Sequence, residues 1–167
     1  SNSILNVGDD VVHLIIELLS EKPIVLPLPY NHILQGFIYK MLDDELSEFL
    51  HEKGYGNGRS FKLLACSNIM GRSDTKSRPG YIQFDRRIKI EVSSPVDKLC
   101  ESFAGGLFNK RLLLGSNIVD VGSLTIDRQE VTSDCIIVRV LSPVVAYSTL
   151  LKADGKKYTC YSQPGDP

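Results

Sequence analysis

The stretch YIQFDRRIKIEVSSPVDKLCESFAGGL, residues 81–107, changes its hydrophobic period near the middle. In its first half, apolar residues alternate with charged ones, which is typical of a half-buried β-strand: Ile88, Ile90 and Val92. In its second half, apolar residues recur at helical spacing: Val96, Leu99, Cys100, Phe103 and Leu107. Ser94 as a cap and Pro95 at the first helical position predict where this helix begins. Gly105-Gly106 weakens the helix near its end.

Further strands are predicted on both sides of this stretch. Before it lie VHLIIELL (12–19), RSFKLLACS (59–67) and then a basic loop punctuated by glycine and proline. After it lie RLLLGSNIVDVGSLTI (111–126) and DCIIVRVLSP (134–143). With a helix between the first two strands, the order is strand, helix, strand, strand, helix, strand, followed by one extra strand. This order predicts an α+β fold of the ferredoxin-like type, βαββαβ.

The predicted first helix is interrupted in the sequence YNHILQGFIYKMLDDELSEFLHEKG, residues 30–54. One apolar stripe comprises Ile33, Leu34, Phe37, Ile38 and Met41, and a second comprises Leu46, Phe49 and Leu50. Between the stripes, Asp43 or Asp44 can cap a new helix by accepting from its first free N–H groups. We therefore predict a sharp bend at Leu42–Asp44, with a second helix near residues 44–53 folding back against the first.

Tyr39 and His51 lie off these stripes. At about 100° per residue, Tyr39 is roughly 150° from the centre of the first stripe, and His51 is roughly 140° from the centre of the second. The pattern therefore places neither side chain in the core. Along one straight helix the two residues would be roughly 18 Å apart, too far to act on one phosphate. A bend between them can bring His51 toward Tyr39.

The charge of the chain is unevenly distributed. The net charge is −1, which points to no partner, but residues 59–90 carry 8 Lys or Arg against 2 Asp or Glu. Such a local excess is a candidate footprint for a polyanion, and a hairpin with ordinary surface charge is an equal alternative. The candidate phosphate contacts are Arg59, Arg72, Lys76, Arg78, Arg86 and Arg87.

Several kinds of site are not predicted. The four cysteines stand 25 to 35 residues apart, without the closely spaced ligand pairs of a zinc site: Cys66, Cys100, Cys135 and Cys160. The segment GYGNG (54–58) lacks the lysine and hydroxyl residue of a phosphate-binding loop. We therefore predict no metal, no small-molecule cofactor and no membrane partner. Without a visible signal peptide, a cytoplasmic location with reduced thiols is predicted.

The chain is predicted to comprise three regions. Residues 1–10 have little periodicity and are predicted to be an unstructured tail or a cloning remnant, and residues 11–142 form the ferredoxin-like domain. Residues 143–167 are predicted to be a linker and a hairpin that turns at Asp154-Gly155. Because a lone hairpin is only marginally stable, this last region is interpreted as the beginning of a truncated second domain.

Four segments resemble one family of RNA-processing proteins. LPYNHILQGFIYKML (28–42), FLHEKG (49–54), FKLLACS (61–67) and VSSP (92–95) are similar to the Cas-six endoribonucleases of the RAMP superfamily, which cut precursor CRISPR RNA into guide units. The resemblance implies two ferredoxin-like domains, of which this chain is the N-terminal portion. The glycine-rich RNA-binding loop of the family's second domain is missing from the sequence.

The resemblance also implies catalytic roles for Tyr39, His51 and Lys62. RNA can be cut without a metal because its own 2′-hydroxyl attacks the adjacent phosphate, leaving a 2′,3′-cyclic phosphate and a 5′-hydroxyl. A histidine can serve as general base or general acid in that step. A lysine ammonium stabilises the charge that develops on the phosphorane. Tyrosine can position the 2′-hydroxyl or assist proton transfer.

Three functional readings remain open at this stage. The first is an endoribonuclease acting on CRISPR repeat RNA, for which this portion alone would be poorly active or inactive. The second is a non-catalytic RNA-binding module or a subunit of a CRISPR effector complex. The third is a protein-interaction domain without an RNA role. The presence of all three catalytic residue types favours the first reading.

Overall fold

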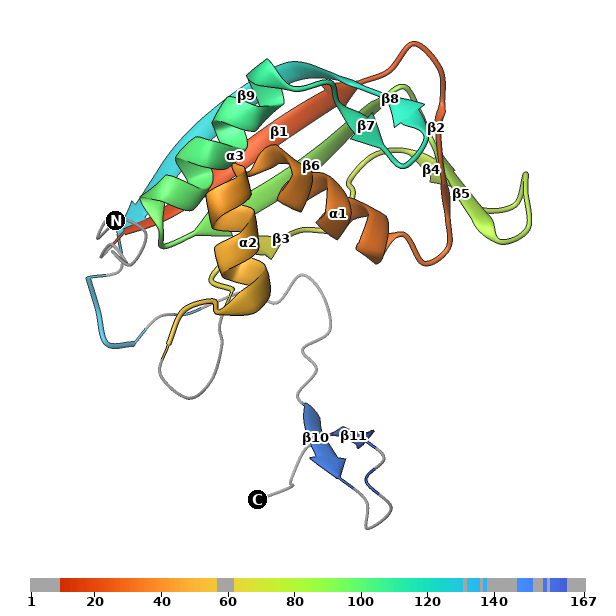
Figure 1. Ribbon diagram of the computed structural model, residues 1–167. Helices are drawn as coiled ribbons and strands as arrows, with labels where there is room; N and C mark the ends of the chain where they lie inside the picture. Colours follow the sequence, from red (N-terminus) through yellow and green to blue (C-terminus); the bar gives the residue numbers. More distant parts are fainter. Residues whose placement is uncertain are drawn as a thin grey trace. The chain divides into compact units, whose positions relative to one another are not determined.

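A computed structural model describes residues 10–56, 62–130, 132–135, 137, 147–151, 155 and 157–161. The chain divides into two compact units, Ser1–Val131 and Thr132–Pro167. The first unit contains a four-stranded antiparallel sheet of order β3-β6-β1-β9, formed by Asp10–Leu19 (β1), Ala65–Cys66 (β3), Arg87–Ser94 (β6) and Asp120–Glu130 (β9). Its helices are Asn31–Met41 (α1), Asp44–Glu52 (α2) and Asp97–Asn109 (α3) (Figure 1). The predicted ferredoxin-like α+β fold is confirmed.

The sheet has one apolar face because apolar and polar residues alternate along both β1 and β6, and the pairing register places the apolar ones side by side. Their register pairs Leu14 with Val92 and Ile16 with Ile90, and all four side chains are buried. Helices α1 and α3 cover this face (Figure 1). The opposite face carries charged side chains, including an ion pair between Arg87 and Glu17 at 3.2 Å. This division follows the two-residue period of the strands.

The helices bury the stripes that the sequence predicts. Phe37 on α1 and Phe103 on α3 are among the largest fully buried side chains. On α2, Leu46 and Leu50 are buried, while Phe49 is half-buried and packs edge-on against the Tyr55 ring at 5.1 Å. The core therefore joins both halves of the interrupted helix to α3 and the sheet.

The predicted strand 81–94 is two strands in two sheets. Tyr81–Phe84 (β5) pairs with Ile24–Pro27 (β2) and with Ser73–Asp74 (β4), whereas β6 begins only at Arg87. After β5 the backbone leaves this three-stranded sheet at Asp85, whose N–H donates to the Arg72 carbonyl at 3.0 Å, and it joins the four-stranded sheet at Arg87. The break arises from these long-range hydrogen bonds.

Other boundaries also shift. Helix α3 begins at Asp97, two residues later than predicted, because Ser94 is still paired with Val12 in the sheet and accepts from the Val96 N–H at 3.0 Å. The strand predicted at 59–67 is described only as the two-residue β3. A small hairpin of Leu113–Leu114 (β7) and Asn117–Ile118 (β8) precedes β9. Most of the strand predicted at 134–143 lies outside the described residues.

The second unit contains the predicted hairpin. Tyr147–Leu151 (β10) and Lys157–Tyr161 (β11) pair antiparallel. Gly155 between them has φ of 78°, a conformation that glycine adopts readily, while Asp154 lies outside the described residues. The domain boundaries at residues 10 and 142 remain predictions. None of the described helices combines the length and apolar character needed to cross a lipid bilayer.

Candidate active site

The predicted bend separates α1 from α2. Helix α1 ends at Met41, and the next two residues, Leu42 and Asp43, are extended. Asp43 caps α2, its Oδ1 accepting from the Leu46 N–H at 2.9 Å. Helix α2 then leaves the end of α1 at a sharp angle (Figure 1). The prediction of a break with an aspartate cap is confirmed, and a single straight helix through Tyr39 and His51 is excluded. The predicted folding of α2 back against α1 is wrong, because the partner that packs along α1 is α3.

Two residues of α3 and the residue directly after it, spaced four apart, hold this bend in place. Ser102 Oγ accepts from the Asp43 N–H and donates to Asp43 Oδ2, both at 2.8 Å. Lys110, directly after α3, donates from Nζ to the carbonyls of Lys40 and Leu42, both at 2.8 Å. Between them, Gly106 packs directly on the Met41 backbone. The direction in which α2 departs is therefore set by α3.

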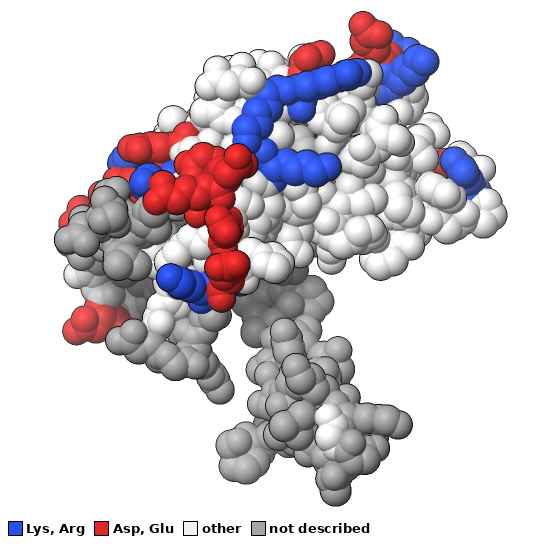
Figure 2. Space-filling view, viewed as in Figure 1, with Lys and Arg blue, Asp and Glu red and all other residues white. Residues whose placement is uncertain are grey.

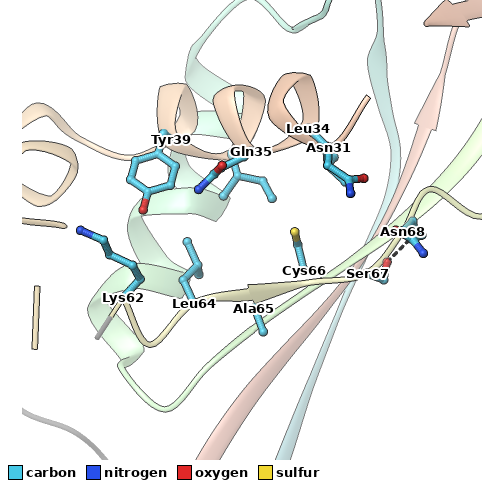
Figure 3. A pocket seen from close by; sticks show the side chains of 11 residues that line it. Asn31, Leu34, Gln35, Tyr39, Lys62, Leu64, Ala65, Cys66, Ser67 and Asn68 are labelled. Carbon is cyan, nitrogen blue, oxygen red and sulfur yellow. Dashed lines mark hydrogen bonds between the residues drawn. The ribbon is translucent and has the colours of Figure 1, made fainter. Parts of the chain in front are cut away.

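Tyr39 and Lys62 line one cavity of about 290 Å³ between α1 and the extended segment 62–68 (Figure 3). Both side chains are half-buried. Burial raises the pKa of the Tyr39 phenol above its ordinary value. The phenol is therefore protonated at neutral pH and can donate a hydrogen bond into the cavity, beside a lysine ammonium.

His51 lies on the exposed side of α2 and is not part of the cavity lining. Acidic side chains gather over α2 (Figure 2). The exposed carboxylates on and directly before this helix are Asp43, Asp44, Glu45, Glu48 and Glu52. The structure thus brings Tyr39 and Lys62 together and leaves His51 on the neighbouring helix. That His51 shares their site remains a prediction.

Sequence reasoning missed most of the polar cavity lining. Asn31 and Gln35 line the cavity from α1, and Cys66 and Asn68 line it from the opposite segment. The available signal was the four-residue spacing of Asn31, Gln35 and Tyr39, which places them on one side of a helix. The alternation of Lys62, Leu64 and Cys66 was a second signal, because alternate residues of an extended segment point the same way.

The predicted basic contacts lie in two places. Arg72, Lys76, Arg78 and Arg86 are exposed, in or beside the loops that flank β4 and β5. The Arg78 guanidinium stacks on the Tyr81 ring at 3.7 Å, a cation–π contact that leaves it at the surface. Arg87 lies on β6 and is paired with Glu17. Arg59 lies outside the described residues.

The loop after β4 also contains an acidic residue. Asp74 accepts hydrogen bonds from the Ser77 hydroxyl and from the backbone N–H groups of Lys76 and Ser77. These bonds, the Ser77 hydroxyl first, lower the pKa of the Asp74 carboxyl. Asp74 therefore shapes the turn that presents the neighbouring basic side chains.

The described residues contain no group of three or more His, Cys, Asp or Glu placed to hold a metal ion. Of the cysteines with described side chains, Cys66 and Cys135 are exposed and Cys100 is buried. Burial raises the pKa of the Cys100 thiol to about 11.

Comparison with known proteins extends this picture. Residues 126–167 match the family profile described as "CRISPR associated protein Cas6, C-terminal". A solved structure titled "CRISPR associated protein Cas6" has a TM-score of 0.60 and 20% identity, covering 93% of this chain. The resemblance to the Cas6 family is confirmed. A Cas6-related protein from Pyrococcus furiosus gives a TM-score of 0.67 at 19% identity, again over 93% of this chain.

A third solved structure is titled "An RAMP protein binding different RNA substrates" and has a TM-score of 0.62 at 17% identity over 93% of this chain. The present chain spans 64%, 63% and 64% of the lengths of these three structures. At these identities the Cas6 structures support the fold alone, and the profile match to the Cas6 C-terminal region includes the β10–β11 hairpin. No curated protein sequence matches the chain.

Proposed function

We propose that this chain is part of a metal-independent endoribonuclease that cuts precursor CRISPR RNA within its repeats. The products are a 2′,3′-cyclic phosphate and a 5′-hydroxyl. The observation that carries the proposal is the convergence of Tyr39 and Lys62 on one cavity of a Cas6-like fold. They are two of the three residues to which the family resemblance assigns catalytic roles, the third being His51.

Each residue has a role that follows from its charge state. The Lys62 ammonium faces the phosphate and stabilises the negative charge that grows on its oxygens. The neutral Tyr39 phenol donates a hydrogen bond and orients the 2′-hydroxyl, because its raised pKa disfavours the phenolate that a general base would need. His51, on the neighbouring helix α2, transfers one of the two protons of the reaction.

The RNA partner would be held largely through its phosphates. The exposed arginines and lysine around β4 and β5 supply this contact, since neutralising phosphates releases counterions and gives sequence-independent affinity. A CRISPR effector complex as a further partner remains a prediction.

One observation favours the alternative of an RNA-binding module that does not cut. His51 stands outside the cavity and among carboxylates, which repel the RNA backbone. Both readings require RNA binding, and they differ in whether the backbone is cleaved.

Cleavage of repeat RNA in EDTA by the full-length protein tests the proposal. We expect cleavage that stops when the 2′-hydroxyl at the cut site is replaced by hydrogen, while binding persists. Lys62→Ala and His51→Ala should each lower the rate constant by roughly 10²-fold or more. The matched control is His32→Ala, a histidine exposed on α1 that does not line the cavity. Cutting of the deoxy substrate, or full activity of the Lys62 variant, would refute the mechanism. Binding without cutting would establish the alternative.

A further inference from the structure

Two rows of side chains face each other across the Tyr39 cavity (Figure 3). One row is Asn31, Gln35 and Tyr39, one turn apart on α1, and it extends about 12 Å at 1.5 Å per residue. The opposite row comes from the segment 62–68, beginning with Lys62 and ending with Asn68. Tyr39 and Lys62 lie at one end, and the amides of Asn31 and Asn68 lie toward the other (Figure 3).

The lining has the character of a nucleotide site. Among the described residues that line it there is one cation, Lys62, and no carboxylate, so the charge of this lining complements a phosphate. Its walls include the apolar side chains of Leu34, Ile38 and Leu64, which suit the flat face of a base. A bare anion would need more positive charge, and a purely apolar ligand would leave the amides without partners.

The amides that face the cavity are not used by the fold. Among the residues drawn in Figure 3, the marked hydrogen bond joins Ser67 Oγ to the Asn68 backbone carbonyl and involves no side-chain amide. Within the described residues, the Asn31 and Gln35 amides have no protein partner. They are therefore available to a ligand. Gln35 stands one turn, about 6 Å, from Tyr39, close to where the reacting phosphate would lie.

The size of the cavity limits the ligand. A volume of about 290 Å³ is just below the roughly 300–1,000 Å³ that small-molecule sites occupy. It suits one base and its sugar rather than a stacked run of bases.

From this arrangement we propose that the cavity binds the nucleotide next to the scissile phosphate and that Gln35 reads its base as adenine. A carboxamide presents one donor and one acceptor side by side, which pair with N7 and the N6 amino group of adenine. Asn31 and Asn68 complete the polar end of the site. This assignment rests on the proposed function, which places the scissile phosphate beside Tyr39 and Lys62.

The test measures binding of repeat RNA that carries deoxyribose at the cut, so that cleavage is not required. Each of the four bases is placed in turn at the two positions that flank the cut, and affinity is measured with the full-length protein. We expect adenine at one of them to be preferred by roughly 5- to 100-fold, the discrimination of one good bidentate contact. Gln35→Ala should reduce that preference to about threefold or less. The matched control Gln83→Ala removes an exposed glutamine of β5 outside the cavity and should leave it unchanged.

Alkylation of Cys66 gives an independent readout, because this thiol lines the cavity. RNA with the preferred base should slow modification of Cys66, while RNA with a pyrimidine there should slow it less. Unchanged base preference in the Gln35 variant would overturn the proposal, even if the protein cuts RNA. If the Gln35 variant loses the adenine preference but the unmodified protein does not cut RNA, the base-reading proposal is supported and the endoribonuclease proposal is refuted.

Discussion

Replacing Gly106 by alanine should push α1 and α3 apart. A Cβ built on Gly106 lies 2.7 Å from the carbonyl carbon of Met41 and 2.8 Å from its Cα, and closer still to its carbonyl oxygen. These are backbone atoms, so no side-chain rotation can relieve the overlap. Restoring contacts of 3.4 Å requires a displacement of about 0.7 Å for the carbonyl carbon and more than this for the carbonyl oxygen. The perturbation falls on the segment that sets the direction of α2.

The expected change in the free energy of unfolding is the difference between a packing cost and a gain in helix propensity. Overpacking a close contact costs about 1–3 kcal/mol, and a backbone obstacle places this substitution at the upper end. Alanine within a helix recovers about 1 kcal/mol relative to glycine. The free energy of unfolding should therefore fall by about 2 kcal/mol. With a denaturant slope of about 2 kcal/mol/M in urea, the unfolding midpoint should fall by about 1 M.

Urea denaturation followed by far-ultraviolet circular dichroism measures this change, and Gly105 provides the matched control. It is the adjacent residue of the same helix, and a Cβ there meets nothing within 4 Å. Gly105→Ala should raise the free energy of unfolding by up to about 1 kcal/mol. If the two variants shift the midpoint in the same direction and by similar amounts, the close contact between Gly106 and Met41 is wrong.

Three further predictions address other parts of the molecule. Lys110→Met should lower the free energy of unfolding by about 1 kcal/mol in the same urea assay, because it removes the hydrogen bonds to the Lys40 and Leu42 carbonyls. The control Arg111→Met should change the free energy of unfolding little. The Cys100 thiol is buried and has a pKa of about 11, so at pH 8 it is ionised in roughly one molecule in a thousand. Pulsed alkylation with mass spectrometry should therefore modify Cys66 and Cys135 first. Labelling of Cys100 at an equal rate would contradict its burial. Arg72→Gln and Arg86→Gln should each reduce the slope of the log–log salt dependence of RNA binding by roughly 0.7. Arg87→Gln should alter that slope less, because the Arg87 cation is already paired with Glu17. An unchanged slope for the Arg72 and Arg86 variants would show that neither residue contacts an RNA phosphate.

The fold was predictable from the sequence because its signals are local. The alternation in β1 and β6 and the stripes on α1 and α3 are set by neighbouring residues, and each stripe is buried as expected. The break before α2 was equally local, since Asp43 caps the helix with its own side chain.

What the sequence did not predict depends on distant partners. Phe84 and Ile88 lie in the same two-residue register, and the one interruption between them is the charged Arg86, which a single strand with an exposed position could also contain. The change of sheet therefore leaves only this weak trace in the pattern. Ser94 has the signature of a helix cap, but its pairing with Val12 keeps it in the sheet. Gly105 and Gly106 look alike in the sequence, and the packing of α1 alone distinguishes them.

The same limit applies to the candidate site. A helical projection places Tyr39 and His51 outside the core, but it cannot show which surface each one reaches. Lys62 and the α1 amides line one cavity because the extended segment 62–68 and the helix α1, separate in the chain, lie on opposite sides of it. His51 depends on the direction of α2, which is set by α3.

The attachment of the bend to α3 has a consequence for native-state hydrogen exchange. The Asp43 amide donates to Ser102, which is 59 residues away in the sequence, so the bond forms only while α3 lies beside the bend. Exchange of this amide therefore reports the docking of the bend on α3 as well as the integrity of α1 and α2. A junction between two short helices would then exchange more slowly than one that no third helix holds.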